Sequence, residues 1–150
     1  MKVALLFTEA TSLFMTENSV LPGSQLSIIP RRLLLVEDHE STARTLQRLL
    51  QRHGHEIWIA LSCREALALA ASHTFDALIC DLDLPDGDGT FLLQKIRQTH
   101  PVQGIVLSGH GSPQDIERCR AAGFSAHLVK PFDVTEIEIV LAQILPVTAA

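Results

Sequence analysis

The stretch ALICDLDLPDGDG, residues 77–89, joins a nearly continuous apolar run to a cluster of acidic and turn-forming residues. A run of this kind indicates a strand that is covered on both faces, as in a parallel sheet. Runs of the same character occur at residues 33–36, 57–60, 105–107 and 126–129. We therefore predict five strands of one parallel sheet.

Helical patterns separate these runs and follow the last one. The fourth helical segment opens with Ser112-Pro113, an N-cap followed by proline, and Gly123 is suited to its C-terminal stop. The last segment opens at Asp133 and ends before Pro146. The alternation predicts an α/β fold, a (βα)5 doubly wound parallel sheet whose functional crevice lies at the carboxyl ends of the strands.

Polar residues stand at these strand ends. They are Glu37 and Asp38 after the first run, Asp81 at the end of the third, Ser108 after the fourth and Lys130 after the fifth. Carboxylates that are about 4 Å apart repel one another by about 4 kcal/mol at an effective dielectric constant of about 20, and a hard cation relieves this repulsion. A few oxygen ligands suit Mg²⁺ better than zinc. With a lysine and a hydroxyl nearby, the set predicts a phosphoryl-transfer site with Asp81 as the nucleophile.

These motifs carry a family resemblance. Residues 31–146 resemble the receiver domain of two-component response regulators through Glu37-Asp38, the Asp81–Gly89 run, Ser108-Gly109 and Lys130-Pro131-Phe132. The resemblance implies a flavodoxin-like fold with strand order 2-1-3-4-5. It also implies a phosphorylation-controlled signalling switch rather than a turnover enzyme, one that catalyses its own phosphoryl transfer and dephosphorylation.

The resemblance assigns a role to each matching residue. Asp81 is expected to accept the phosphoryl group, and Lys130 and Ser108 to contact it. The residues expected to hold Mg²⁺ are Glu37, Asp38, Asp81 and the backbone carbonyl of Asp83. The Lys130-Pro131 bond is expected to be cis, an isomer that a bond before proline adopts at low cost.

One position departs from the family pattern. The fifth strand usually carries Tyr or Phe three residues before the lysine, and here the residue is His127. Two interpretations stay open: a half-buried neutral histidine, or an imidazole that makes the switch sensitive to pH near neutrality.

Two other functions compete with the switch. A pseudo-receiver would keep the fold as a protein-binding module that is never phosphorylated. A haloacid-dehalogenase-like phosphatase also begins from an Asp nucleophile, but its motif usually lies on the first strand, whereas a βαβα unit precedes Asp81 here. The chain is also compatible with a stand-alone receiver, a piece of a hybrid kinase or an intermediate of a phosphorelay.

Composition limits the partners and the location. The chain has 150 residues, a net charge of −5 and three cysteines without a CxxC motif. We expect reduced thiols, no direct contact with nucleic acid and a cytoplasmic protein, since no run reaches the roughly 18 apolar residues of a membrane span. The expected partners are a sensor histidine kinase or a histidine phosphotransfer protein and a downstream protein target. A homodimer through the fourth-helix, fifth-strand and fifth-helix face is also expected.

The ends of the chain differ from the middle. Residues 1–30 lack a clean helical or strand period. We interpret them as a leader or linker, partly disordered, with a short helix within residues 3–15. The receiver domain is predicted to cover residues 31–146, followed by a tail at residues 147–150.

Overall fold

The computed structural model describes residues 4–7, 12–15, 29–109 and 111–145. The five predicted strands are present as β3 (Arg32–Val36), β4 (Glu56–Ala60), β5 (Ala77–Asp81), β8 (Gln103–Ser108) and β9 (Ala126–Val129). They pair in parallel in the order β4-β3-β5-β8-β9. In chain order of these five strands this is 2-1-3-4-5, so the predicted topology is confirmed.

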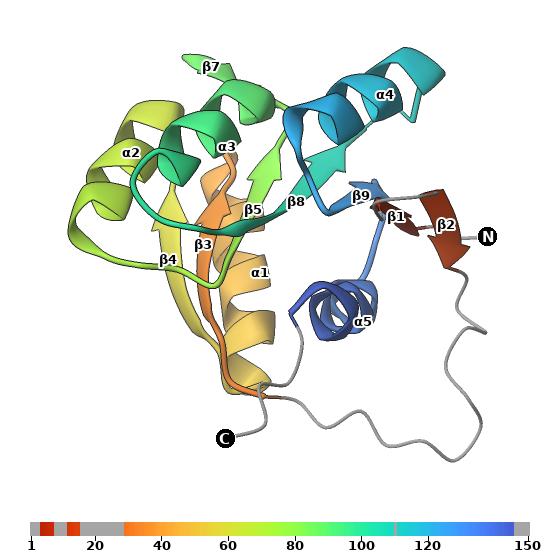
Figure 1. Cartoon of the computed structure of the whole chain (residues 1–150). Coiled ribbons are helices and arrows are strands. Elements are labelled where there is room, and N and C mark those ends of the chain that lie inside the picture. Colours follow the sequence, from red (N-terminus) through yellow and green to blue (C-terminus); the bar gives the residue numbers. More distant parts are fainter. Residues whose placement is uncertain (1–3, 8–11, 16–28, 110, 146–150) are drawn as a thin grey trace.

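Five helices cover the two faces of the sheet. They are α1 (Glu40–Arg52), α2 (Cys63–Ser72), α3 (Gly89–Arg97), α4 (Pro113–Ala122) and α5 (Val134–Ile144). Helices α1 and α5 lie on one face, and α2, α3 and α4 lie on the other (Figure 1). Alternate strand residues point to opposite faces and both faces are covered, which explains why the strands are apolar at nearly every position. Leu33 and Leu35 join the core beneath α1 and α5, whereas Leu34 and Val36 join the core on the opposite face.

The helix boundaries follow the predicted signals. The Ser112 hydroxyl accepts a hydrogen bond from the amide of Asp115, and Pro113 occupies the first turn of α4. Gly123 ends α4 at a φ of 97°, a left-handed conformation that glycine adopts without a steric cost. Ser62 caps α2 by accepting from the amide of Glu65.

Residues 1–30 contain strands where a helix was expected. Strands β1 (Ala4–Phe7) and β2 (Ser12–Met15) form an antiparallel pair, and β1 also pairs antiparallel with β9. The expected helix within residues 3–15 is therefore wrong. The exposed edge of β9 offers unpaired backbone groups, and a short apolar segment satisfies them by joining the sheet. The sheet thus has seven strands, in the order β2-β1-β9-β8-β5-β3-β4.

A small second sheet follows β5. Strands β6 (Asp83–Leu84) and β7 (Gly87–Asp88) pair antiparallel directly after Asp81. The predicted tail at residues 147–150 lies outside the described residues. The boundary of the receiver domain at residues 31 and 146 stays a prediction.

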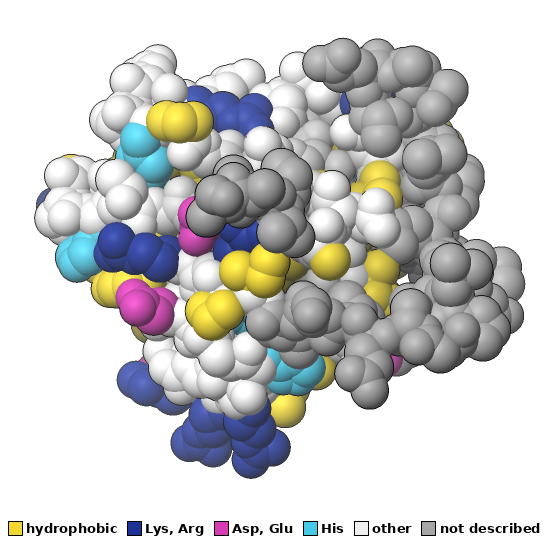
Figure 2. All heavy atoms as spheres, turned by 60° about the horizontal axis from the view of Figure 1, so that its bottom comes forward, with side chains coloured by type: hydrophobic (Ala, Val, Ile, Leu, Met, Phe, Trp, Pro, Cys, Tyr) yellow, Lys and Arg dark blue, Asp and Glu magenta, His cyan; other side chains and the backbone are white. Residues whose placement is uncertain are grey.

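Large hydrophobic side chains are seldom exposed among the described residues. On the face shown in Figure 2, hydrophobic side chains form small separate groups, and Lys and Arg side chains gather at the lower edge. Phe91 is the only large hydrophobic residue among the described ones that is classed as exposed. Cys63, Cys80 and Cys119 are buried and free, as expected. In the described part of the chain, no helix combines the length and apolar character that a membrane span requires.

Candidate functional site

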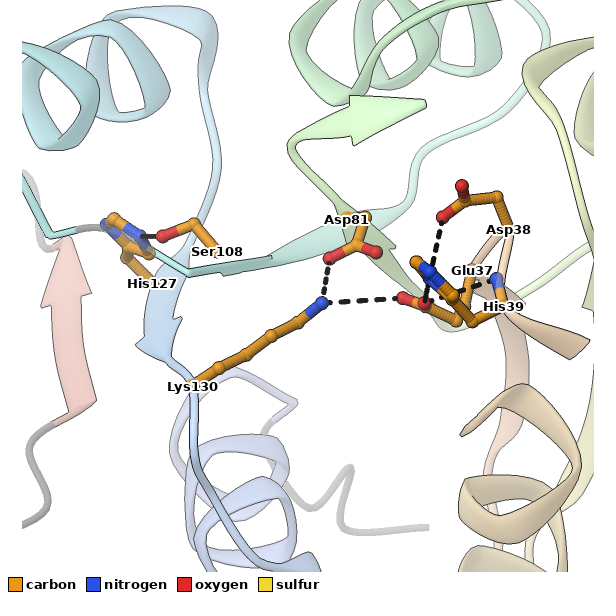
Figure 3. Close-up of polar contacts among 7 residues, drawn as sticks. All are labelled: Glu37, Asp38, His39, Asp81, Ser108, His127 and Lys130. Carbon is orange, nitrogen blue, oxygen red and sulfur yellow. Dashed lines mark hydrogen bonds and ion pairs between the residues drawn. The ribbon is translucent and has the colours of Figure 1, made fainter. Parts of the chain in front are cut away.

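The predicted site residues meet at the carboxyl-terminal edge of the sheet. Glu37 and Asp38 follow β3, Asp81 ends β5 and Lys130 follows β9. Figure 3 shows the side chains of Asp81, Glu37 and Lys130 pointing toward one another. Three separate strands thus place their polar ends around one point, as the doubly wound topology requires.

Lys130 connects the two buried carboxyl groups. Its Nζ lies 2.7 Å from Asp81 Oδ1 and 3.6 Å from Glu37 Oε2. Asp81 is 7% exposed and Glu37 is 1% exposed. One ammonium group therefore faces two carboxyl groups, so a formal negative charge remains when both are ionised.

The close contact of these three charged groups shifts the pKa values of Asp81, Glu37 and Lys130. Burial and the neighbouring Glu37 together raise the pKa of Asp81 to about 7, although Lys130 opposes the rise. Burial also works against ionisation of Glu37, but Asp81, Lys130 and His39 outweigh it and lower the Glu37 pKa. Lys130 is itself partly buried, yet both carboxylates raise its pKa. The pair in this form therefore holds about one proton at mildly acidic pH and loses it around neutral pH, as closely spaced carboxyl groups do.

Two acidic residues and a histidine lie close enough together to hold a metal ion. One ligand atom each from Glu37, Asp38 and His39 lies within 4.8 Å of the others. Glu37 Oε2 is buried and receives no hydrogen bond from any residue that the structure describes. Carboxylate oxygens are the ligands that Mg²⁺ prefers, and a cation here would also relieve the repulsion between Glu37 and Asp81. These residues fit the expected ion.

The segment after Asp81 is fixed to the body of the domain. The Leu82 amide donates to the carbonyl of Leu107, and the Gly89 amide donates to the carbonyl of Leu82. The Asp86 carboxylate accepts hydrogen bonds from the amides of Cys63 and Arg64 at 2.8 and 2.9 Å. Asp83 begins β6 within this segment, and the expected role of its carbonyl as a metal ligand stays a prediction.

Ser108 and His127 form a second polar pair beside the carboxyl cluster. Ser108 Oγ lies 2.6 Å from His127 Nε2. The hydroxyl group is directed at His127 and away from Asp81 (Figure 3). His127 is 0% exposed, so it is fully buried and not half-buried as one interpretation had it. Burial lowers the pKa of His127, which favours the neutral imidazole over the pH-sensitive interpretation.

The Lys130-Pro131 peptide bond is cis, as expected. The Lys130 amide donates to the carbonyl of Ser108 at 2.8 Å. The backbone that carries the ammonium group is thereby attached to the end of β8, beside the Ser108–His127 pair.

A family model described as the response regulator receiver domain matches residues 33–142. The chain belongs to this family. Curated relatives agree with the assignment. The sensory/regulatory protein RpfC of Xanthomonas campestris is 32% identical over 120 residues, which cover 75% of this chain and 16% of RpfC. The transcriptional regulatory protein PdtaR of Mycobacterium tuberculosis is 32% identical over 126 residues, which cover 81% of this chain and 62% of PdtaR.

Solved structures place this receiver domain in the same fold. The non-phosphorylated HemR receiver domain of Leptospira biflexa is 30% identical with a TM-score of 0.71, covering 81% of this chain and 98% of that one. A CheY-like receiver domain protein of Methanospirillum hungatei is 27% identical with a TM-score of 0.71, covering 77% and 93%. The chain spans less than two thirds of the length of RpfC and PdtaR.

The family match counts against the phosphatase alternative but not against the pseudo-receiver. Asp81 ends β5, the third of the five parallel strands in chain order and not the first. The phosphatase alternative expects the nucleophile on the first strand and has no support from the family match. The pseudo-receiver alternative shares the fold and stays open.

Two residues of this receiver site were missed by the sequence analysis. His39 Nδ1 lies 3.1 Å from Glu37 Oε1 and 3.4 Å from Asp38 Oδ1. Its position directly after the acidic pair was the available signal. Asp86 fixes the segment after Asp81 through contacts with α2 that are distant in sequence, so local patterning carried no signal for this role.

Proposed function

We propose that this receiver domain is a phosphorylation-dependent switch that accepts a phosphoryl group on Asp81 with Mg²⁺ bound. The observation that carries the proposal is the cluster of Asp81, Glu37 and Lys130, in which the ammonium group touches the acceptor carboxyl. Glu37, Asp38, Asp81 and the carbonyl of Asp83 would hold the ion. When bound, Mg²⁺ would offset the carboxylate charge and provide positive charge for phosphoryl oxygens.

The protein's own groups have defined tasks in the transfer. An Asp81 carboxylate oxygen attacks the phosphorus atom of a phosphohistidine donor, so that an O–P bond forms while the N–P bond breaks. The electron pair of the broken bond stays on the donor imidazole. Lys130, released from its contact with the free carboxylate, binds a phosphoryl oxygen and stabilises the charge that develops there. In a separate step, water attacks the phosphorus atom of the acyl phosphate, the bond to the Asp81 oxygen breaks, inorganic phosphate leaves and the Asp81 carboxylate is restored.

A groove next to the site suits a phosphodonor. It has a volume of about 730 Å³ and includes Leu46 and Leu49 of α1, Phe132 and Val134, together with Lys130 of the site itself. An apolar groove that opens beside Asp81 and Lys130 can take the apolar face of a helix from a protein donor. We infer that a sensor histidine kinase or a histidine phosphotransfer protein binds here, and that a downstream protein target reads the phosphorylated form.

The proposal is tested by incubation of the chain with acetyl phosphate and Mg²⁺. Intact-mass spectrometry should show one added phosphoryl group, which peptide mapping places on Asp81. The Asp81→Asn variant and the wild type in EDTA should show none. Modification at another residue, or no modification with folded wild-type protein, overturns the proposal and leaves the pseudo-receiver module as the better account.

A further inference from the structure

Strand β1 covers the outer edge of β9. Its register pairs Ala4 with Leu128, Leu5 with His127 and Leu6 with Ala126. The amide of Phe7 also donates to the carbonyl of Ser125 at 2.8 Å. Leu6 is 6% exposed and joins the core beneath α1 and α5. Residues 4–7 therefore occupy the edge that the expected homodimer face would otherwise present (Figure 1).

His127 lies at the centre of this contact. Ala126 and Leu128 belong to the core beneath α1 and α5, so His127 between them points to the face covered by α4. Phe7 packs against the core on that same face. β1 therefore borders His127 through the backbone of Leu5, while Phe7, hydrogen-bonded to Ser125, lies on the same face of the sheet.

The imidazole of His127 is fully buried, so its hydrogen bond with Ser108 is costly to lose. His127 Nδ1 is buried without a hydrogen-bond partner among the described residues. An unpaired N–H is costlier to bury than an unpaired acceptor, so we assign the proton to Nε2, which donates to Ser108 Oγ. Loss of Ser108 as the acceptor would leave both ring nitrogens without partners in a site that water does not reach.

We propose that residues 4–7 are an intramolecular cover of the β9 edge, and that phosphorylation of Asp81 loosens this cover through Ser108 and His127. The inference rests on the proposed function. The Ser108 hydroxyl faces His127 rather than Asp81, so rotation toward a phosphoryl group carries Oγ away from Nε2 (Figure 3). The imidazole then requires water, and the four-residue strand beside it is the shortest element that borders it.

Loosening of β1 has a consequence for binding. A freed β9 edge presents a row of backbone donors and acceptors, which is a surface that an extended segment can join. The cover on this edge in the unphosphorylated form is the chain's own residues 4–7, which keep other strands away until the acceptor is modified.

Hydrogen exchange of the full chain with and without Mg²⁺ and beryllofluoride tests the inference. Binding of beryllofluoride is followed separately by ¹⁹F NMR. We expect the amides of residues 4–7 to exchange about tenfold faster in the beryllofluoride form, with the amides of α2 as an unchanged internal reference. Asp81→Asn should abolish the response.

Two variants make the test specific to the Ser108–His127 pair. Ser108→Ala removes the acceptor and should speed exchange at residues 4–7 without beryllofluoride. His127→Phe removes the ring N–H and should keep exchange slow in both forms. Bound beryllofluoride with unchanged exchange at residues 4–7, or with changes confined to α4, overturns the inference while the proposed function stands. Absence of beryllofluoride binding overturns both.

Discussion

Lys130 Nζ lies 2.7 Å from Asp81 Oδ1, so the residue after β9 contacts the last residue of β5 across the end of β8. This contact lowers the pKa of Asp81 against the effect of burial. It also holds an ammonium group where phosphoryl oxygens would arrive. Both effects bear on how Lys130 variants behave.

Lys130→Gln should slow phosphorylation of Asp81 by acetyl phosphate by about 10²-fold, the cost of removing one charged group that stabilises a transition state. The measurement is a time course of intact mass at saturating Mg²⁺. Lys95→Gln is the matched control, because Lys95 lies on α3 against Phe91 rather than in the site. Equal rates for wild type and Lys130→Gln would remove Lys130 from the mechanism.

The stability of the metal-free protein should fall as pH rises through the range below about 7. The ordinary pKa of an aspartate is 3.8 and that of Asp81 is about 7, so between these values the folded state holds a proton that the unfolded state has lost. Urea unfolding in EDTA between about pH 4.5 and about pH 7.5, which covers most of that window, checks this.

Asp81→Asn should flatten this decline, and Mg²⁺ should restore wild-type stability at the upper end of the range. The lowered pKa of Glu37 acts in a different window, because its contribution is lost only as pH falls below 4.5. A wild-type profile that matches Asp81→Asn would show that Asp81 ionises normally.

Glu138→Leu should destabilise the fold by about 1–3 kcal/mol, since it leaves a buried donor without an acceptor. His55 Nε2 lies 2.8 and 3.0 Å from the Glu138 carboxylate oxygens, and His55 Nδ1 accepts from the amide of Arg31. Glu138→Gln retains an acceptor oxygen and should lose less. Urea denaturation measures the difference, and equal losses for the two variants would contradict the assigned hydrogen bond.

Gly104→Ala should destabilise the protein by about 1–3 kcal/mol through overpacking. A Cβ atom at Gly104 would lie 2.7 Å from Phe124 Cδ1 and 3.0 Å from Leu93 Cδ1. Gly109→Ala is the control, because a Cβ there meets nothing within 4 Å. Thermal unfolding of the two variants should differ clearly, and similar midpoints would mean that the core under α3 yields easily.

Sequence patterning predicted the five parallel strands because each is buried on both faces and keeps an apolar residue at nearly every position. It did not predict β1, whose four residues are too few to show a period and whose pairing with β9 joins positions more than 100 residues apart. Similarly, Asp81 and Lys130 were predictable from their place at strand ends. The Ser108–His127 bond was not, because it depends on side-chain rotamers and on the register of β8 against β9.

The buried cluster around His55 and Glu138 lies at the end of the sheet opposite Asp81, where β3 begins. There Arg31 also donates from Nη2 to the carbonyl of Leu145 at 2.9 Å. The Arg31 side chain therefore holds the start of the segment 31–145 next to its end at Leu145. In a chain reduced to residues 31–145, a short glycine-rich bridge between these two residues should permit circular permutation with new termini in a surface loop. Without the bridge, a domain fused at either end of that segment would depart from the same corner of the molecule, away from Asp81.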